Sequence, residues 1–555
     1  MHQNVISPSF QANFGINTNI LDLILTDNCN RIYTVEHSPP LGGIEHGHHI
    51  LKYSFSYEKS SHLIKTSKKI KFLYNKGNYN ELDLYFKSIN WVQEFEGCEV
   101  NLCYEKWLKI YESGCEKFIP KLQLDNNNTR NHKCSPWMTK ELKRMCKEKK
   151  NSWFSNRNSG FKNQVELNKY KKLNKVIKKL VKSNIRDYER NLAVNSKHNP
   201  KSVYSYINNK INIKESIKAI KTNNGVIYTD SLEIVDTLNE FFASVFIKDG
   251  STVGDLNEEC ATKCPHPSFN KSIILKHLNN LNTQKSVGPD KVHPKVLKEC
   301  AKSLSFPLSL IFEKSFVTGS IPKLWSCANV VPLFKKGNKL DPTNYRPVSL
   351  TSIVCKIMER IIRDQMMVYL VENNLISKEQ HGFVNNKSCI TNLLKTLDLI
   401  TQAFGEDYSI DILFLDFAKA FDSVSHVKLL KKLFGLGFVS FMLNWYKAFL
   451  SNRVQRVVIG ENISSWKKVT SGVPQGSVLG PLLFVIFIND LSKKIIKDTK
   501  LYADDTKVIS INRCKDDSKL LQEDINTLVK WSEEWLIKFN ESKCKVMYFG
   551  KQNPK

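Results

Sequence analysis

The spacing of apolar residues divides the chain into three regions. Residues 1–57 contain short apolar runs of strand length, namely Ile20 to Leu25, Ile32 to Val35 and Ile50 to Tyr57. A segment of this size rarely buries enough surface to fold alone. We therefore expect these strands to be the last part of a larger β domain.

The second region, residues 58–246, is dominated by helical spacing. In one predicted helix, apolar residues recur from Leu173 to Ile185, while lysines occupy the remaining face. Leu232 to Phe246 carries a second apolar stripe and predicts another helix. The region is thus predicted to be a basic helical linker, and the Gly-, Ser- and Pro-containing residues 247–270 are predicted to be a loop.

The third region, residues 271–555, alternates helical and strand patterns with no obvious linker. Helices combined with an antiparallel hairpin indicate the α+β class. The pattern predicts helices at 272–281, 294–317, 350–373, 388–404, 426–434 and 518–539, and strands at 410–416, 454–460, 500–503, 506–511 and 545–549.

The formal net charge of +28 is concentrated in one segment. Residues 130–218 hold 24 Lys and Arg against 6 Asp and Glu, a net charge of +18. A basic block of this kind binds polyanions through counterion release, whatever their sequence. A solvated helix surface and a helix lying on a membrane surface are the alternatives that charge alone leaves open.

Composition argues against a membrane-spanning or secreted protein. No apolar stretch approaches the roughly 20 residues that a membrane-spanning helix requires. Met1 is not followed by the basic and apolar stretches of a signal peptide. The 14 cysteines include no CxxC pair, which favours free thiols in a reducing compartment.

Three acidic residues stand at the ends of predicted strands. Asp416 follows the apolar run Ile412 to Leu415, and Asp504 and Asp505 lie at the tip of a predicted hairpin. Taken singly, each is accounted for by a helix cap, a salt bridge or a plain turn. Brought together, the three carboxylates would hold hard cations such as Mg²⁺, and two such ions about 3.5–4 Å apart suit phosphoryl transfer.

A glycine-rich loop, Ser471 to Pro481, lies between these acids and is followed by an apolar helix up to Asp490. Its glycines permit backbone conformations and close approaches that side chains would block. A loop that opens a helix also directs N–H groups toward a phosphate or a base-pair edge. Gln475 offers both a donor and an acceptor there, although a purely structural loop is the alternative.

Further sequence blocks extend this series over most of residues 271–549. In order, the blocks are KSVGPD from Lys285, NYRPVSL from Asn344, QHGF from Gln380, LDFAKAFD from Leu415, PQG from Pro474, YADD from Tyr502, and then Trp531, Trp535, Asn540 and Lys543. This series resembles the reverse transcriptases of non-LTR (LINE-type) retrotransposons, closest to jockey-like elements. The resemblance implies the fingers and palm of a right-hand polymerase.

The resemblance also implies roles for matching residues. The bulky ring of Phe421 would exclude a ribose 2′-hydroxyl, and Lys543 would protonate the pyrophosphate leaving group, unless it is merely a solvated lysine at a strand edge. The implied catalytic residues are Asp416, Asp504, Asp505 and Lys543, the metal-binding residues are Asp416, Phe417, Asp504 and Asp505, and the nucleotide-binding residues are Arg346, Ala420, Phe421, Gln475 and Gly476. From charge alone, the nucleic-acid-binding residues are predicted to be Lys171, Lys172, Lys175, Lys178 and Lys179.

Residues 1–57 resemble the end of the apurinic-type endonuclease that precedes the polymerase in these elements. Leu21 to Thr26 and Pro39 to His46 carry this likeness, with Ile-Glu-His at 44–46 where the family has Ser-Asp-His. The earlier metal-binding and catalytic parts of that fold are not in this sequence. We therefore expect no nuclease activity from it.

Two departures from the family pattern bear on activity. Family members usually carry Arg after Gly-Phe and Gly-Arg before the Ser, where this chain has Val384, Asn386 and Lys387. The missing arginine is expected to weaken contact with template or nucleotide, because Val makes no charged hydrogen bond. Since the sequence stops at Lys555, we expect truncation at both ends, with the primer-grip strand and the helical thumb missing.

The leading hypothesis is an RNA-directed DNA polymerase that transfers a nucleotide from a dNTP to a primer 3′-hydroxyl. It would use two Mg²⁺ ions, or Mn²⁺ in their place, with an RNA template, a DNA primer or target and dNTPs as partners, and no membrane. The alternative is a catalytically impaired retroelement remnant that only binds nucleic acid. By resemblance, the protein is expected in the nucleus, in a cytoplasmic ribonucleoprotein, or in both.

Overall fold

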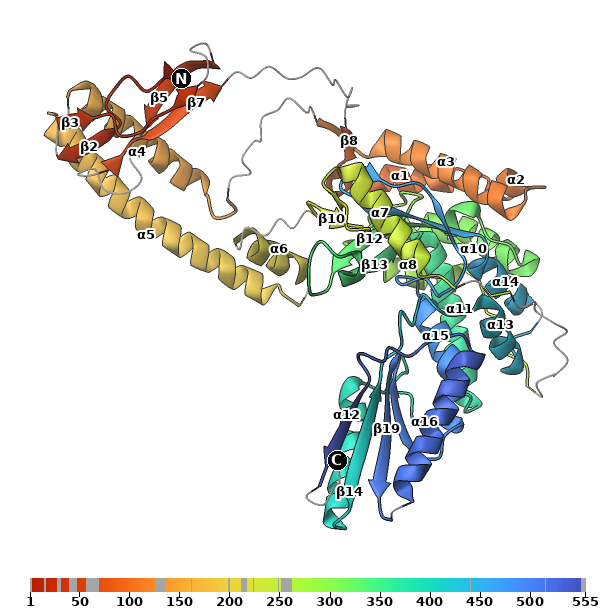
Figure 1. Ribbon diagram of the computed structural model, residues 1–555. Helices are drawn as coiled ribbons and strands as arrows, with labels where there is room; N and C mark the ends of the chain where they lie inside the picture. The colour runs from red at the N-terminus through yellow and green to blue at the C-terminus, as the bar shows by residue number, and fades with distance from the viewer. Residues whose placement is uncertain are drawn as a thin grey trace. The chain divides into compact units, whose positions relative to one another are not determined.

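The protein is described from a computed structural model, in which the chain forms two compact units (Figure 1). Residues 1–71 and 123–216 make up the first unit, and residues 72–122 and 217–555 make up the second. The structure describes residues 2–13, 16–26, 31–38, 47–55, 69–124, 135–160, 162–197, 200–210, 217–222, 224–247, 249–250, 262–439, 441–514 and 516–550. The endonuclease-like turn at 39–46 and much of the predicted loop at 247–270 lie outside these ranges.

The first unit combines short antiparallel strands with a helical hairpin. Strand β5 (Ile32–Ser38) pairs with β7 (Ile50–Phe55), and helix α4 (Lys140–Asn158) packs against α5 (Gln164–Val194). The other elements here are β1 (His2–Gln3), β2 (Phe10–Asn13), β3 (Ile16–Asn19), β4 (Leu25–Thr26), β6 (Gly47–His48) and α6 (Pro200–Lys210), and the unit boundaries fall within β8 (Lys69–Phe72) and β9 (Lys121–Leu124).

The basic helix predicted around Leu173 is confirmed as part of α5. Asn163 caps its N-terminus by accepting hydrogen bonds from the first-turn amides. Leu167 and Tyr170 of α5 pack with Trp153 of α4 in a small buried core. The apolar side of α5 is therefore used within the hairpin, which leaves its lysines exposed.

Two of the three strands predicted in residues 1–57 are confirmed as β5 and β7, but the third is wrong. Within Ile20 to Leu25, only Leu25 belongs to a strand. The Ser9 hydroxyl accepts hydrogen bonds from the amides of Leu21 at 3.1 Å and Asp22 at 2.9 Å. These amides bond to a side chain instead of a neighbouring strand, which the apolar pattern does not reveal.

The second unit includes a group of helices that the sequence assigns to the linker region. Residues 72–122 contain η2 (Tyr74–Lys76), α1 (Tyr79–Lys87), α2 (Trp91–Phe95) and α3 (Val100–Phe118). The predicted boundaries at 58 and 246 therefore differ from the structure. The reason is aromatic burial: Tyr104 and Trp107 are buried on α3, and the Tyr104 hydroxyl donates to Asp290 Oδ2 at 2.7 Å.

A five-stranded sheet in the second unit is built from strands between residues 327 and 469. Strand β12 (Cys327–Phe334) pairs antiparallel with β13 (Tyr345–Leu350) and parallel with β15 (Arg453–Ile459). Helix α7 (Ser231–Ser244) covers β15 with a buried apolar stripe, as its sequence predicts. The sheet is completed by β16 (Asn462–Ile463) and β17 (Lys467–Val469). Strands β10 (Ile220–Lys221) and β11 (Ile227–Tyr228) form a separate two-stranded sheet, and Ile220 packs against the five-stranded sheet.

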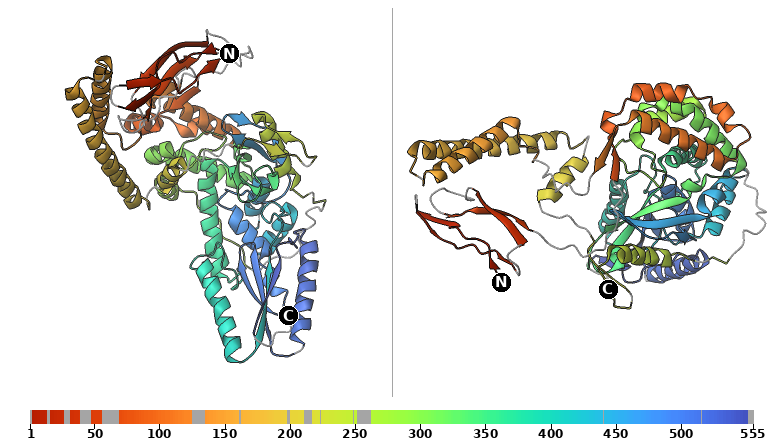
Figure 2. Two further views of the ribbon diagram at one scale, coloured as in Figure 1. Left: turned by 60° about the vertical axis from the view of Figure 1, so that its left-hand side comes forward. Right: turned by 90° about the horizontal axis from the view of Figure 1, so that it is seen from above.

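A second, four-stranded sheet has the order β18-β19-β14-β20. Helices α12 (Cys389–Gly405) and α16 (Asp517–Glu534) pack against it, as Figures 1 and 2 show. The strands predicted in this part of the chain are confirmed. Their bounds are Ser409–Leu415 for β14, Asp498–Tyr502 for β18, Asp505–Asn512 for β19 and Lys545–Phe549 for β20.

Helix α16 ends five residues earlier than the sequence predicts. Leu536 has a φ of 57°, a left-handed conformation that turns the chain away from the helix axis. The turn lets the Asn540 amide donate to the Asp416 carbonyl at 2.7 Å and lets Phe539 stack on Phe417. A helix continuing to 539 would carry these residues away from Asp416.

The five-stranded sheet packs with α7 in a small core, whereas the buried helices and the four-stranded sheet share one large core. A cation lies within it: Lys432 of α13 (His426–Gly435) pairs with Asp490 at 2.5 Å and lies 3.6 Å from the ring centroid of Trp535.

Among the described residues, no helix is both long and apolar enough to cross a membrane. The remaining helices are α8 (Lys271–Asn279), α9 (Pro294–Glu299), α10 (Ala301–Thr318), η3 (Lys323–Trp325), η4 (Pro342–Asn344), α11 (Ile353–Glu372), α14 (Phe441–Leu450), α15 (Gly480–Ile488) and η5 (Leu491–Lys493).

Candidate active site

The ends of adjacent strands bring the three predicted acids to one region of the four-stranded sheet. Asp416 directly follows β14, and Asp505 begins β19 after the turn that carries Asp504. The antiparallel register pairs Leu415 with Thr506, so the next position on each strand is Asp416 and Asp505. Asp416 and Asp504 line the same cavity.

The electrostatics of Asp505 indicate that the three carboxylates interact. Burial raises the pKa of Asp505, and the negative charges of Asp504 and Asp416 raise it further. Lys335 and Lys507 act in the opposite direction. At Asp505, burial and the two neighbouring carboxylates therefore outweigh the two opposing lysines, an effect that a bound cation would counteract.

Lys543 lies next to the first of these acids. Its Nζ atom is 2.6 Å from Asp416 Oδ2, in an ion pair that is half exposed on the lysine side. Within the described part of the chain, no three His, Cys, Asp or Glu side chains are arranged as a ready-made metal cluster. Asp416 is therefore paired with the Lys543 ammonium rather than grouped with two further carboxylates.

The residues predicted to contact the nucleotide line the same cavity as the acids. Arg346 comes from β13, Ala420 and Phe421 follow Asp416 in sequence, and Gln475 comes from the glycine-rich loop. The ring of Phe421 stacks on Phe484 with 4.5 Å between the centroids, which holds it in place. Of the implied nucleotide-binding residues, only Gly476 is not part of the lining.

Gly476 instead sets the position of the glycine-rich loop. Its φ is +128°, and a Cβ atom there would lie 2.3 Å from the Ser349 carbonyl oxygen. The Ser349 amide also donates to the Gln475 carbonyl at 2.8 Å. The close approach predicted for these glycines is therefore confirmed at Gly476, where it seats the loop on β13.

A chain of hydrogen bonds fixes the orientation of Gln475. Its side-chain oxygen accepts from Arg346 Nε at 3.0 Å, and its amide nitrogen donates to both carboxylate oxygens of Asp422 at 3.0 Å. An amide held at both ends cannot rotate freely, so Asp422 positions Gln475 and, through it, Arg346. Asp422 stands in the LDFAKAFD block, but no pattern in the sequence indicates its partner Gln475, 53 residues away.

Three lysines that the sequence did not single out also line the cavity. Lys335 and Lys336 follow β12, and Lys419 lies between Asp416 and Phe421. Burial lowers the pKa of Lys419, and its φ is 51°. Together, Lys335, Lys336 and Lys419 give the cavity wall positive charge, which suits phosphate groups. The adjacent Lys-Lys-Gly sequence at 335–337 was the only available signal.

Asp422→Asn is expected to change how stability depends on pH. Burial raises the pKa of Asp422 to about 6, against the opposing effects of the Gln475 hydrogen bonds and of Lys419. A carboxyl whose pKa rises on folding stabilises the fold most below its unfolded pKa, and this stabilisation is lost as the pH rises through the folded pKa. Asn lacks this loss, so the melting temperature of the variant relative to wild type should rise by a few degrees between pH 4 and pH 7.

The matched control for this measurement is Asp498→Asn, which removes an exposed carboxylate from β18. Thermal melts monitored by circular dichroism at each pH would give both differences. The variant-minus-wild-type difference should stay flat for the control. A flat difference for Asp422→Asn as well would contradict the assigned pKa.

The reverse transcriptase (RNA-dependent DNA polymerase) family matches residues 334–554. A probable RNA-directed DNA polymerase from transposon BS of Drosophila melanogaster is 31% identical over 307 residues, covering 53% of this chain and 33% of that protein. The RNA-directed DNA polymerase from mobile element jockey of the same species is 31% identical over 295 residues, covering 50% of this chain and 31% of that protein. Residues 334–554 therefore match a reverse transcriptase domain, and both relatives are polymerases of mobile elements.

The chain spans about a third of the length of these curated relatives. Among solved structures, an apo telomerase from Candida tropicalis, truncated from its C-terminal domain, matches 48% of this chain and 65% of its own. That match has 11% sequence identity and a TM-score of 0.31, which is too low to inform the fold. The family match and the mixed helix and sheet structure agree with the reverse transcriptase fold.

In this reverse transcriptase domain, the QHGF block supports the hairpin that carries Asp504. The side-chain oxygen of Gln380 accepts hydrogen bonds from the amides of Gly382 at 2.7 Å and Ala503 at 3.0 Å. The His381 amide donates to the Leu501 carbonyl at 2.8 Å. Since Gln380 is buried, these bonds fix the backbone immediately before Asp504.

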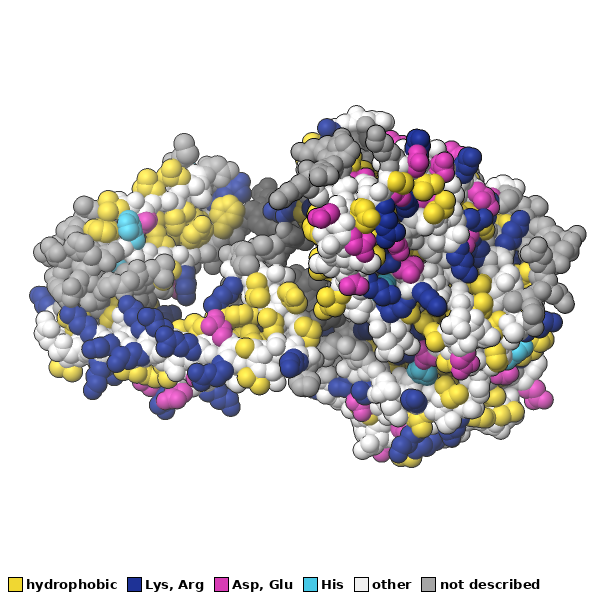
Figure 3. Space-filling view, turned by 90° about the horizontal axis from the view of Figure 1, so that it is seen from below, with side chains coloured by type: hydrophobic (Ala, Val, Ile, Leu, Met, Phe, Trp, Pro, Cys, Tyr) yellow, Lys and Arg dark blue, Asp and Glu magenta, His cyan; other side chains and the backbone are white. Residues whose placement is uncertain are grey.

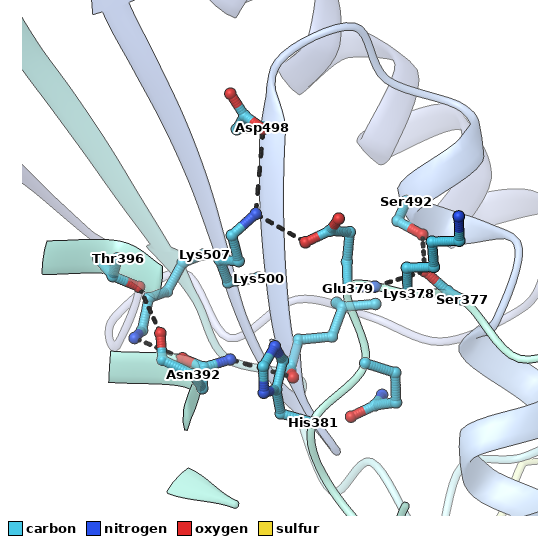
Figure 4. Close-up of polar contacts among 12 residues, drawn as sticks. Ser377, Lys378, Glu379, His381, Asn392, Thr396, Ser492, Asp498, Lys500 and Lys507 are labelled. Atoms are coloured by element: carbon cyan, nitrogen blue, oxygen red, sulfur yellow. Dashed lines mark hydrogen bonds and ion pairs between the residues drawn. The ribbon is translucent and has the colours of Figure 1, made fainter. Parts of the chain in front are cut away.

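Polar side chains reinforce this contact between the reverse transcriptase blocks, as Figure 4 shows. Lys500 Nζ lies 2.6 Å from Glu379 Oε2. Asn392 of α12 donates from Nδ2 to the Leu501 carbonyl at 3.2 Å and accepts from Lys507 Nζ at 2.8 Å. The hairpin of β18 and β19 is thus held by Glu379, which precedes the QHGF block, and by Asn392 of α12.

Of the three residues that differ from the reverse transcriptase pattern at 384, 386 and 387, Lys387 has a structural role here. Lys387 Nζ donates to the carbonyl oxygens of Lys378 at 2.7 Å and Gln380 at 2.9 Å. The lysine therefore braces the segment that supports Asp504. Val384 and Asn386 line a second cavity beside α11, and the expected weakening at Val384 stays a prediction.

Proposed function

We propose that this chain contains the polymerase core of an RNA-directed DNA polymerase. It would add deoxynucleotides to a DNA primer 3′-hydroxyl under the direction of an RNA template. The observation that carries the proposal is one cavity lined by Asp416 and Asp504 together with Arg346 and Gln475. Such a role would place the protein in the nucleus, in a cytoplasmic ribonucleoprotein, or in both.

A divalent metal fits the residues present. Carboxylate oxygens are the donors that Mg²⁺ prefers, and the burial and carboxylate repulsion that raise the pKa of Asp505 favour a bound cation. We assign Asp416 and Asp504 as the main ligands, with Asp505 and Phe417 beside them. When bound, two Mg²⁺ ions, or Mn²⁺ in their place, supply charge stabilisation at the attacking and leaving oxygens.

The basic side of the cavity would position the incoming dNTP. Phosphoryl transfer depends mostly on positioning and charge, and Arg346, Lys335 and Lys419 bring positive charge to the cavity wall. The hydrogen bonds that Gln475 donates to Asp422 hold its side-chain oxygen toward Arg346, so both side chains are set before a substrate arrives. Preorganised groups of this kind cost no reorganisation during the reaction.

Phe421 would select deoxynucleotides over ribonucleotides. Its ring lines the cavity and is held by the stack on Phe484. A fixed aromatic ring leaves no room to rearrange around an added hydroxyl, because protein interiors are close-packed. The exclusion of a ribose 2′-hydroxyl is therefore a steric effect of this side chain.

Lys543 would act as the proton donor to the pyrophosphate leaving group. Its ammonium lies in the cavity, and general acids work only within hydrogen-bond reach of the group they protonate. The ion pair with Asp416 also favours a second candidate, because a lysine bonded to that carboxylate competes with a metal. In this second reading, the chain is an impaired remnant that only binds nucleic acid.

Primer extension separates the two candidates. The purified full chain is incubated with a DNA primer annealed to an RNA template, dNTPs and Mg²⁺ or Mn²⁺. We expect products whose sequence follows the template and whose yield drops when ribonucleotides replace dNTPs. Tight binding of the same primer–template without extension under either metal would contradict the polymerase proposal and support the remnant.

A further inference from the structure

Helix α5 of the first unit carries a long, one-sided row of positive charge. Between positions 171 and 190 it holds eight Lys and Arg, all exposed. At about 100° per residue they fall within an arc of roughly 120°, and at about 1.5 Å per residue they extend over about 29 Å. The charged arc consists of Lys171, Lys172, Lys175, Lys178, Lys179, Lys182, Arg186 and Arg190.

Within the same stretch of α5, acidic side chains are few. Over the same stretch of α5 the acids are Asp187, which projects outside the arc, and Glu189. Glu189 is already engaged: its Oε1 accepts from Lys210 Nζ at 2.7 Å and from the Tyr206 hydroxyl at 2.5 Å. Figure 3 shows Lys and Arg side chains gathered along the underside of the unit that contains α5.

Most apolar residues of α5 outside the arc are buried or partly buried, although Val165 and Val176 are exposed. Tyr170 and Leu167 pack against Trp153 of α4, and Asn184 donates to the Trp137 carbonyl at 3.1 Å. A helix that lies on a membrane needs a free apolar face to enter the lipid boundary. Since the apolar side of α5 is used within the hairpin, the arc favours a rigid, water-soluble polyanion over a membrane surface.

We propose that the charged arc of α5 is a docking surface for double-helical nucleic acid, which it binds through the phosphate backbone without reading sequence. Single-strand binders usually add aromatic side chains on which bases stack. The arc contains no aromatic residue. A straight row of cations about 29 Å long instead matches nearly one turn of duplex, which carries one charge per about 1.7 Å.

This proposal does not depend on polymerase activity, because it rests on the first unit alone. Its natural ligand would be duplex nucleic acid of any sequence that the protein meets, including base-paired RNA. Contacts to phosphates position a protein on nucleic acid but carry no sequence information. The arc would therefore raise the local concentration of nucleic acid for any second site on the chain.

The test uses the full chain with four of the lysines neutralised: Lys171→Gln, Lys175→Gln, Lys178→Gln and Lys182→Gln. Gln has nearly the same helix propensity as Lys, so the helix should persist, and circular dichroism would verify this. Binding of a 20-base-pair duplex is followed by fluorescence anisotropy at several salt concentrations. The slope of log affinity against log salt should become shallower by about 3–4, since each lost phosphate contact contributes about 0.9.

The matched control replaces the same four lysines with Arg, which keeps the charge and should leave the slope unchanged. A single strand of equal length and anionic phospholipid vesicles serve as competing ligands. The four substitutions to Gln should weaken duplex binding at least tenfold and affect single-strand binding less. An unchanged duplex slope, an equal loss for single strands, or a loss confined to vesicles would each overturn the proposal.

Discussion

Replacing Asp504 with Asn is expected to lower the rate of single-nucleotide incorporation by on the order of a thousandfold. The amide has the same shape as the carboxylate but lacks its charge, so it is a poor ligand for a hard cation. Asp504 lines the cavity with Asp416, and its charge acts on Asp505. The measurement is kcat/KM for extension of a DNA primer on an RNA template.

Asp498→Asn is the matched control, because Asp498 is an exposed carboxylate on β18, the strand that leads into the turn carrying Asp504. Its incorporation rate should stay within about twofold of wild type, as is usual for surface substitutions. Melting curves of both variants would verify that folding is intact. Full incorporation by Asp504→Asn would remove Asp504 from the reaction and, with it, the assignment of the cavity as the polymerase site.

The strand ends of the candidate site were predictable because the relevant interactions are local. The apolar run before Asp416 and the hairpin around Asp504 and Asp505 each show in a few residues, and antiparallel pairing of β14 with β19 then joins them. The close approach at Gly476 was also predictable, since glycine is the residue that permits it. Local pattern and tertiary structure agree at these points.

The positioning contacts were not predictable, because each joins segments far apart in the chain. Gln380 bonds to the amide of Ala503, 123 residues away, and Tyr104 bonds to Asp290 over 186 residues. No periodicity in either segment encodes the partner. The same reason explains why residues 72–122 were assigned to a linker: their buried face is visible in the sequence, but the surface that covers it is not.

This difference has a consequence for the family motifs. The QHGF block does not line the cavity, yet the structure uses it to hold the backbone next to Asp504. Position 382 requires glycine because a side chain would not fit there, and not because of an unusual backbone conformation. A Cβ atom on Gly382 would lie 2.4 Å from the Ala503 amide nitrogen and 3.0 Å from the Tyr502 carbonyl carbon, and neither backbone atom can move without moving the turn.

Gly382→Ala is therefore expected to reduce primer extension by about a hundredfold, since a shift of about 1 Å in a catalytic group has an effect of this size. The loss should appear mainly in kcat, because the residues that bind the nucleotide are unchanged. Gly405→Ala is the control: a Cβ there meets nothing within 4 Å, so activity should be retained. If Gly382→Ala folds and extends primers at the wild-type rate, the QHGF segment does not position Asp504.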